Sequence, residues 1–259
     1  MIGNKSTGIV IQERDRRLLR ELAVMRVIDR EQAQCVAGFG STTRANHRLL
    51  VLTKAGLLRR FFLGTTSGGK KALYALSPKG ARLVEVPLRG PRRKRDEVLV
   101  ADFFVTHRLM INQVFCQVKY QPIPFPGARF LRWVSFHEPI RTGSSLIPDG
   151  YLEVAGSAKV LAAFLEVDLG HEALRIWKTK IDAYLQYAVS GDFRSQSNQA
   201  QFRVLVIANS VRRLQSIRRA VASTTDKIFW FSTFDSINRD GFWSSIWVRP
   251  KDDRPQSLM

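Results

Sequence analysis

Ile147-Pro148-Asp149-Gly150 and Phe164-Leu165-Glu166-Val167-Asp168 are the two stretches that decide the fold of the C-terminal half of this chain. Between them lies a turn signal, Ala155-Gly156-Ser157-Ala158, so the pattern predicts an antiparallel hairpin. If Ser157 and Ala158 are the central turn residues, the register sets Asp149 opposite Glu166.

Three carboxylates meet in that register, because side chains alternate along a strand and Asp168 shares a face with Glu166. Like charges at short range cannot all stay ionised without a cation. Oxygen ligands at this density suit Mg²⁺ or Mn²⁺. The prediction is a metal site of Asp149, Glu166 and Asp168. The alternative is a hairpin with a charged, solvated face, and a one-residue slip would turn Asp149 away.

A helix is predicted over residues 172–189, after the strand break at Gly170. Lys178 and Lys180 flank its inward stripe, so either lysine could reach the end of the preceding strand. Most lysines beside such a stripe only extend along it towards water. Tyr184 and Tyr187 lie at inward or near-inward positions, which favours core packing over a covalent tyrosine mechanism.

Asp149, the Glu166-Val167-Asp168 segment and the lysine-bearing helix resemble the core of the PD-(D/E)xK restriction-endonuclease-like superfamily. The chain is also similar, over nearly its whole length, to the replication-relaxation family of mobile-element proteins, some of which are relaxases related to restriction endonucleases. The Lys-x-x-x-Tyr pattern at Lys180 and Tyr184 belongs to that likeness. The resemblance implies Asp149, Glu166, Asp168 and Lys180 as catalytic residues, with Lys178 in reserve. One departure is Asp168, which stands where the common signature has lysine.

The charge of the chain points to a polyanionic partner. The formal net charge is +19 and the pI is about 10.8. Residues 1–96 hold 21 Lys and Arg against 7 Asp and Glu, a net of +14, so the basic excess belongs mainly to the first part. Cys35 and Cys116 lie in apolar helical patterns and are predicted to be core residues in a reducing compartment. With no signal peptide or membrane span in sight, we expect a cytoplasmic protein.

A helix-turn-helix is predicted near the N-terminus. Helices are expected over residues 13–25, up to about 37, and over 42–55, with Ser41 as an N-cap. The early, outward positions of the third helix are the expected DNA contacts: Thr43, Arg44, His47 and Arg48.

A hairpin of residues 58–63 and 72–76 follows, with a basic tip, so the first domain reads as a winged helix. The expected phosphate contacts are Lys70 and Lys71 at the tip and, in a connector, Arg92, Arg93, Lys94 and Arg95. The alternative is a small α+β domain with a solvated basic face and an ordinary linker.

The predicted fold class is α/β: an N-terminal winged helix-turn-helix followed by a restriction-endonuclease-like α/β domain with a mixed sheet. The domains are 1–86, winged helix; 87–127, basic linker with a connecting helix over 97–119; 128–250, nuclease-like; and 251–259, a frayed tail. Further strands are expected over residues 130–138, 202–208, 227–233 and 242–248, and a loop over 190–201.

Two functions of different class follow. The first is a metal-dependent, relaxase-like DNA-nicking protein of plasmid or conjugative-element replication or mobilisation. Its partners would be double-stranded DNA, single-stranded DNA at a nick, and a second copy of the chain or other replication and mobilisation proteins. The second is a non-catalytic winged-helix DNA-binding regulator or accessory protein with a degenerate nuclease fold. A weaker third hypothesis is a repressor with a ligand-binding C-terminal domain.

Overall fold

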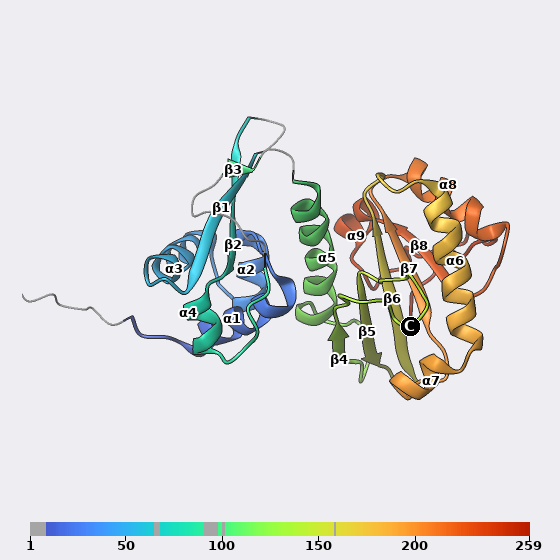
Figure 1. Cartoon of the computed structure of the whole chain (residues 1–259), viewed down its shortest axis with the longest axis horizontal. Coiled ribbons are helices and arrows are strands. Elements are labelled where there is room, and N and C mark those ends of the chain that lie inside the picture. Colours follow the sequence, from blue (N-terminus) through green and yellow to red (C-terminus); the bar gives the residue numbers. More distant parts are fainter. Residues whose placement is uncertain (1–8, 65–67, 91–97, 100–101, 158) are drawn as a thin grey trace, which may run out of the picture. The chain divides into compact units, whose positions relative to one another are not determined.

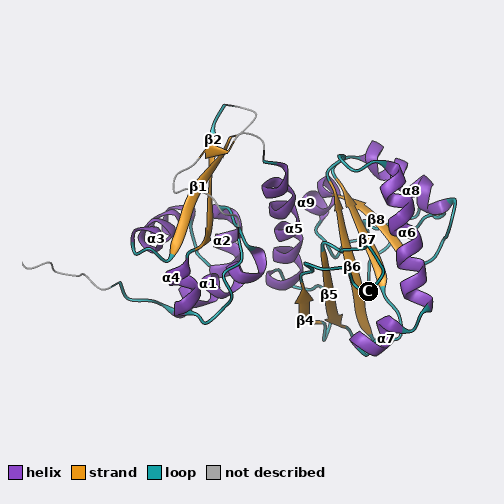
Figure 2. Cartoon of the chain, viewed as in Figure 1, coloured by secondary structure: helices purple, strands orange, loops and turns teal. Residues whose placement is uncertain are grey.

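A computed structural model describes residues 9–64, 68–90, 98–99, 102–157 and 159–259 of the chain. The chain divides into two compact units, Met1–Cys116 and Gln117–Met259, drawn in Figure 1 and coloured by secondary structure in Figure 2. Each unit has its own sheet. Among the described residues, none of the helices combines the length and the hydropathy needed to cross a bilayer.

The first unit begins with three capped helices. Asp29 and Gln32 form a capping box at the start of α2, and the Ser41 side chain accepts a hydrogen bond from the Arg44 backbone N–H at the start of α3. The C-cap Gly38 of α2 has a φ of 67°, a left-handed conformation that glycine adopts at little cost. The helices are α1 Glu13–Met25, α2 Arg30–Ala37 and α3 Thr42–Lys54.

A three-stranded sheet completes this unit. β1 (Leu58–Gly64) pairs antiparallel with β2 (Lys70–Leu76), as the predicted hairpin requires. α4 (Pro78–Leu83) follows β2. β3 (Val98–Leu99) pairs parallel with β1, so the sheet order is β2-β1-β3. The prediction of one helix from residue 97 was wrong at its start, because α5 (Phe103–Tyr120) begins only after this short strand.

α5 belongs largely to the core of the first unit and is not a free connector. The Asn112 side chain donates to the backbone carbonyls of Met25 (3.0 Å) and Val27 (2.6 Å). Gln32 of α2 donates to the Leu109 carbonyl at 2.8 Å. Leu109 also joins a buried apolar cluster with residues of β1 and β2. The predicted linker of residues 87–127 is therefore corrected, because most of this helix is packed into the unit.

The second unit is built on a five-stranded mixed sheet in the order β4-β5-β6-β7-β8. β4, β5 and β6 pair antiparallel, and β6, β7 and β8 pair parallel. The strands are β4 Arg129–Val134, β5 Gly150–Ala155, β6 Val160–Asp168, β7 Arg203–Ala208 and β8 Phe229–Thr233. Helices with a hairpin, followed by an α/β unit with a mixed sheet, confirm the predicted α/β class and its mixed sheet.

One face of the sheet packs on the crossover helices α6 (Leu174–Val189) and α8 (Val211–Ala222), as Figure 1 shows. Phe164 lies at the centre of an aromatic cluster on this face, with ring centroids 4.9 Å from Tyr151 and 5.0 Å from Phe202. Tyr184 and Tyr187 of α6 belong to the same cluster and are 0% and 2% exposed, which agrees with the predicted packing role.

Three predicted segments differ from the structure. The strand expected over residues 130–138 ends at Val134, and His137 and Glu138 are exposed beyond it. The loop expected over 190–201 contains a short helix, α7 (Asp192–Ser197), because Phe193 is buried in the aromatic cluster. Residues 242–248 follow α9 (Phe234–Asp240) and do not form a strand; only isolated bridges occur in them, at Trp247 and Val248.

The tail of residues 251–259 was predicted to be frayed, and this was wrong. Gln256 forms a β-bridge with Trp247, and Leu258 is only 1% exposed. Arg203 of β7 donates to the Leu258 carbonyl at 2.6 Å. A buried side chain and paired backbone hold the tail against the sheet.

Candidate active site

Asp149 and Glu166 lie side by side at the end of the β5–β6 hairpin. Gly150 pairs with Leu165, and the Asp149 N–H donates to the Leu165 carbonyl at 3.1 Å, the register predicted from the turn. An Asp149 carboxylate oxygen accepts a hydrogen bond of 2.7 Å from the Val167 N–H. Glycine is needed at position 150, since a Cβ there would lie 2.6 Å from the ring of Trp133.

Glu166 is the buried centre of the site, with only 1% of its surface exposed. The ammonium group of Lys180 lies 2.8 Å from Glu166 Oε2, and the Tyr184 hydroxyl donates to Oε1 at 2.6 Å. Both partners come from α6, whose apolar stripe packs on the sheet and so directs them at β6.

Lys180, and not Lys178, is the lysine at the site. Lys178 is exposed. Lys180 is held between Glu166 and Glu172, whose two carboxylate oxygens each lie 2.9 Å from its ammonium group. Burial would lower the pKa of Lys180, but the charges of Glu166 and Glu172 outweigh burial and raise the pKa. Lys180 therefore stays positively charged at neutral pH.

Burial raises the pKa of Glu166 to about 7, with the positive charge of Lys180 acting against the increase and the negative charge of Asp149 adding to it. Near neutral pH the side chain is thus close to its midpoint between the neutral acid and the carboxylate. Near neutral pH a metal cation can therefore displace the proton of Glu166 with a small free-energy cost for deprotonation.

Asp168 was predicted as the third metal ligand, and the structure does not support this role. Arg213 of α8 grips Asp168 with two hydrogen bonds of 2.7 Å. Trp177 Nε1 (2.8 Å) and the Gly170 N–H (2.7 Å) use the same two oxygens. Burial would raise the pKa of Asp168, but the bonds from Arg213 and Trp177 lower it. Asp168 lies on the predicted face, but its oxygens are occupied in joining β6 to α6 and α8.

The donor atoms suit a hard divalent cation only in part. Within the described residues, the structure contains no group of three His, Cys, Asp or Glu residues that could hold a metal. Asp149 and Glu166 remain as a pair. Mg²⁺ is commonly held by one or two carboxylates together with water and substrate phosphates. A two-carboxylate site therefore fits the residues, and the predicted three-carboxylate site does not.

The residues predicted to contact DNA separate into two groups. Thr43, Arg44 and His47 are exposed on α3. Arg48 is not available in the same way: it donates to the fully buried Asp15 at 2.9 Å and 2.5 Å and to the Val10 carbonyl at 2.6 Å. This arginine fastens α3 to α1, which corrects its predicted role.

The hairpin residues divide similarly. Lys70 is exposed at the start of β2. Lys71 lies one residue further into the strand, and its ammonium group is 2.5 Å from Asp29, the N-cap of α2. Lys71 is therefore a strand residue in an ion pair and not a residue of the hairpin tip. Four predicted contacts lie outside the described residues: Arg92, Arg93, Lys94 and Arg95.

The sequence profile of the replication-relaxation family matches residues 19–205, most of the chain. The chain belongs to this family. No curated protein matches the chain. Restriction endonuclease FokI is similar in structure over 85% of this chain and 42% of its own, at 12% identity and a TM-score of 0.30. The chain thus spans less than half of FokI, and a similarity this low supports no inference.

Two groups at the site of this replication-relaxation protein were not identified from its sequence. Arg213 belongs to none of the motifs predicted above, and Glu172 was expected only as the first residue of the helix over residues 172–189. A signal for Arg213 did exist, because β6 and β7 are parallel neighbours and pair Asp168 with Ala208. Residues that begin the helix after β7 must then lie close to Asp168.

Proposed function

We propose that this replication-relaxation protein binds DNA and nicks it with Mg²⁺ or Mn²⁺ during replication or mobilisation of a plasmid or conjugative element. The observation that carries the proposal is the convergence of Asp149, Glu166 and Lys180. They come from the β5 end, β6 and α6, and the direct contact is the 2.8 Å bond from Lys180 to Glu166. Two carboxylates with a lysine match the chemistry of metal-assisted phosphodiester hydrolysis.

Asp149 and Glu166 would hold the metal ion, which when bound polarises a phosphate oxygen and lowers the pKa of water. Glu166 must lose its proton to bind the metal ion, so metal binding is coupled to proton release. Lys180 is charged, because its two neighbouring glutamates raise its pKa. It would therefore act as a fixed positive charge for the scissile phosphate and not as a base. Glu172 would keep Lys180 in place when Glu166 turns to a metal.

A covalent tyrosine route is less compatible with the site. Tyr184 is fully buried, and burial together with the charge of Glu166 raises its pKa well above the usual value. Its hydroxyl is thus protonated and donates to Glu166. Tyr187 is 2% exposed and donates to Gln196 at 2.9 Å. Neither phenol meets the needs of a nucleophile, which are access and an ionised oxygen.

The first unit would supply the DNA contacts. Thr43, Arg44 and His47 are exposed on α3, the second helix of the helix-turn-helix, and Lys70 is exposed beside the hairpin tip. Residues 1–96 carry the net charge of +14. Charge of this kind gives affinity for phosphates, and α3 offers side chains for base edges.

A non-catalytic accessory protein is the second candidate, and one observation favours it. Asp168 stands where the common nuclease signature has lysine. Its carboxylate accepts hydrogen bonds from Arg213 and Trp177, an arrangement typical of a structural role. In that case Lys180 and Glu166 would be a buried ion pair that stabilises the fold.

Relaxation of supercoiled plasmid with Mg²⁺ or Mn²⁺ tests the proposal. Asp149→Asn should abolish nicking, and Lys180→Ala should slow it by about 100-fold, the usual loss when one charge-stabilising group is removed. Lys178→Ala, on the exposed side of the same helix, is the matched control and should leave the rate unchanged. DNA binding should persist in all three variants. If the wild type binds DNA but cuts neither supercoiled nor single-stranded DNA with either metal, the accessory function is correct.

A further inference from the structure

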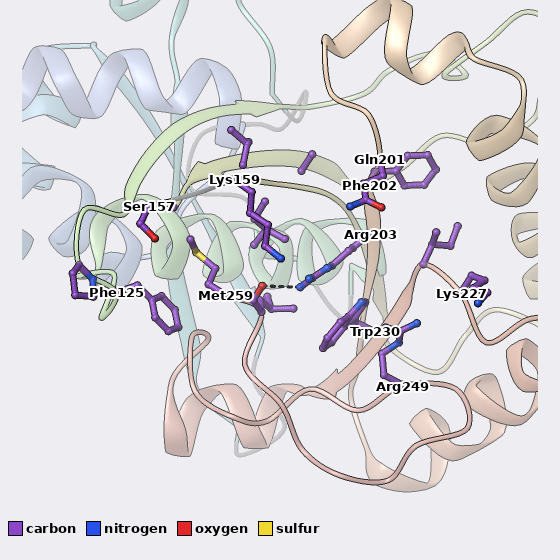
Figure 3. Close-up of a pocket in the computed structure, with 17 residues that line it drawn as sticks. Phe125, Ser157, Lys159, Gln201, Phe202, Arg203, Lys227, Trp230, Arg249 and Met259 are labelled. Atoms are coloured by element: carbon purple, nitrogen blue, oxygen red, sulfur yellow. Dashed lines mark hydrogen bonds between the residues drawn. The ribbon is translucent and has the colours of Figure 1, made fainter.

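A cavity of about 610 Å³ opens in the C-terminal unit at the other end of the sheet from Asp149 and Glu166. It lies where the parallel strands β6, β7 and β8 begin, and Val160, Arg203 and Trp230 contribute to its walls (Figure 3). Glu166 follows Val160 on the same strand by six residues, which separates the two places by roughly 20 Å at 3.3 Å per residue. The cavity is therefore distinct from the candidate active site.

The lining is basic. Lys159, Arg203, Lys227 and Arg249 contribute positive charge, and no Asp or Glu side chain is among the residues that line the cavity. Lys227 has an exposed neighbour, Asp226, at 3.8 Å. Across the described part of the chain, Lys159, Arg203 and Arg249 form no ion pair with a carboxylate. The cavity thus holds three cations whose charge no side chain offsets.

The two arginines are fixed in place but keep unused donors. Their guanidinium carbons lie 4.3 Å (Arg203) and 4.8 Å (Arg249) from the centroid of the Trp230 ring, as Figure 3 illustrates. Arg203 donates to the Leu258 carbonyl, and Arg249 donates to the Asp226 carbonyl at 2.7 Å. The Nε of Arg249 is buried and has no acceptor among the described residues. A guanidinium has five N–H donors, and only one donor of each arginine bonds to an acceptor among the described residues.

The positive charge is costly without an anion. Burial, and next the charge of Arg249, lower the pKa of Arg203. Both effects disfavour the charged form, and a bound anion would relieve both. Guanidinium groups with free N–H donors bind phosphate oxygens in pairs of parallel hydrogen bonds.

The rest of the wall is planar and apolar. Phe125, Phe202 and Leu161 of β6 are among the apolar residues that line the cavity. A nucleobase is a flat ring that stacks on aromatic and guanidinium faces. The volume lies within the range of pockets for small ligands and cofactors.

We propose that this cavity binds a nucleoside phosphate, with the phosphate at Arg249, Arg203 and Lys159 and the base against the apolar wall near Phe125. The ligand is either a free nucleotide or the 5′-phosphorylated end of a DNA strand, which present the same chemistry. The site does not depend on nicking activity, because it shares no residue with Asp149, Glu166 and Lys180.

Isothermal titration of the full-length protein in EDTA tests the site with five probes: 5′-dAMP, deoxyadenosine, inorganic phosphate, a 5′-phosphorylated oligothymidine and the same oligothymidine without its 5′-phosphate. The expected order is that 5′-dAMP binds at least about tenfold more tightly than deoxyadenosine or phosphate alone, since both parts of the ligand make contacts. Tighter binding of the 5′-phosphorylated oligothymidine than of the same oligothymidine without its 5′-phosphate would identify a strand end as the source, and equal binding of the two oligonucleotides would identify a free nucleotide. If deoxyadenosine or phosphate binds as tightly as 5′-dAMP, the assignment is wrong.

Variants localise the binding. Arg249→Gln should weaken 5′-dAMP binding at least tenfold, and Lys159→Gln, at an exposed position, should weaken it several-fold without affecting folding. Arg212→Gln changes an exposed arginine of α8 that does not line the cavity, and it is the matched control. Asp149→Asn should leave 5′-dAMP affinity unchanged, which separates this site from the candidate active site. Unchanged binding in both Arg249→Gln and Lys159→Gln would overturn the proposal, as would a loss in Asp149→Asn.

Discussion

The protonation state of Glu166 is set by the groups that surround its carboxyl group. This carboxyl group is buried. It accepts hydrogen bonds from Lys180 and Tyr184, and it lies beside the carboxylate of Asp149. Burial favours the neutral acid, and Lys180 favours the carboxylate. The result is a pKa of about 7, so a change near neutral pH alters the charge of the site. Groups poised in this way are common at functional sites.

The raised pKa predicts a pH dependence of stability. Between about pH 4.5 and 7 the folded protein keeps a proton on Glu166 that the unfolded chain has released, so the free energy of unfolding falls as the pH rises. The stabilisation is complete below about pH 4.5 and is lost through about pH 7. Its size is at most about 3–4 kcal/mol, since a tenfold change in proton affinity is worth about 1.4 kcal/mol.

Chemical denaturation from pH 5 to 8 measures this effect. Glu166→Gln should lack the decline seen in the wild type, because glutamine does not titrate. Asp182→Asn, an exposed carboxylate of the same helix, should keep it. Equal pH slopes for wild type and Glu166→Gln would show that Glu166 ionises normally.

The sequence allowed some residue roles to be predicted and not others. The Asp149–Glu166 register followed from local spacing, whereas the preference for Lys180 over Lys178 followed from the family resemblance. Both agree with the structure. The assignments of Asp168 and Arg48 failed because their partners are distant. Arg213 lies 45 residues beyond Asp168, and Asp15 lies 33 residues before Arg48. Spacing within one element cannot show which distant charge will occupy a side chain.

At the scale of elements, the Asp168–Arg213 pair joins the end of β6 to the start of α8. Arg213 also donates to the Glu172 carbonyl at 2.5 Å, just before α6. One guanidinium therefore holds a strand and two helix starts together. The side chains are 1% and 15% exposed for Asp168 and Arg213, so this is a buried pair and not a surface ion pair.

A double-mutant cycle measures that junction. Arg213→Ala should lower the free energy of unfolding by about 3 kcal/mol, because breaking a buried pair leaves a charge without its partner. Asp168→Asn should also destabilise, but the double variant should lose less than the sum of the two. Arg212→Ala, the exposed neighbour, should change stability by less than about 0.5 kcal/mol. Additive losses would mean that Asp168 and Arg213 act separately.

Helices and strands were predicted correctly where the periodic pattern of apolar residues was long. The prediction failed where tertiary packing, and not a periodic pattern, determines the conformation. α1, α2 and α3 of the first unit and the five sheet strands of the second were predicted, but residues 242–248 were wrongly expected to form a strand. The Trp247 indole donates to the Phe242 carbonyl at 2.9 Å and is fully buried, so this segment folds back on itself. β3 has only two residues and so lacks a readable alternation.

At the scale of the whole molecule, the most basic part of the sequence and the first compact unit end at different residues. Residues 1–96 carry +14 of the formal net charge of +19, but the first compact unit extends to Cys116. α5 provides the difference, since it supplies Val105 and Leu109 to the core and Asn112 to two carbonyls of the α1–α2 connection. The predicted first domain ended at residue 86, and composition could not show that the helix beyond the basic stretch folds back into the unit.

Two fragments of the chain with the same net charge, one with α5 and one without it, test whether folding of the first unit requires this helix. Residues 1–96 and residues 1–120 both have a formal net charge of +14, because residues 97–120 add two basic and two acidic side chains. Removing α5 deletes Val105 and Leu109 from the buried apolar cluster with β1 and β2. Losing a buried aliphatic side chain costs about 2–5 kcal/mol, and the total stability of a domain is about 5–15 kcal/mol. We therefore expect cooperative thermal unfolding by circular dichroism for residues 1–120 only.

DNA binding should follow folding and not charge. If α3 and the hairpin present Arg44 and Lys70 in a fixed arrangement, residues 1–120 should retain affinity for duplex DNA at salt concentrations that release residues 1–96. A flexible basic chain binds mainly through counterion release, so its affinity falls steeply with salt. Electrophoretic mobility shifts from 50 to 300 mM salt measure the difference. Equal binding and equal melting of the two fragments would show that α5 is dispensable and that charge alone accounts for the affinity.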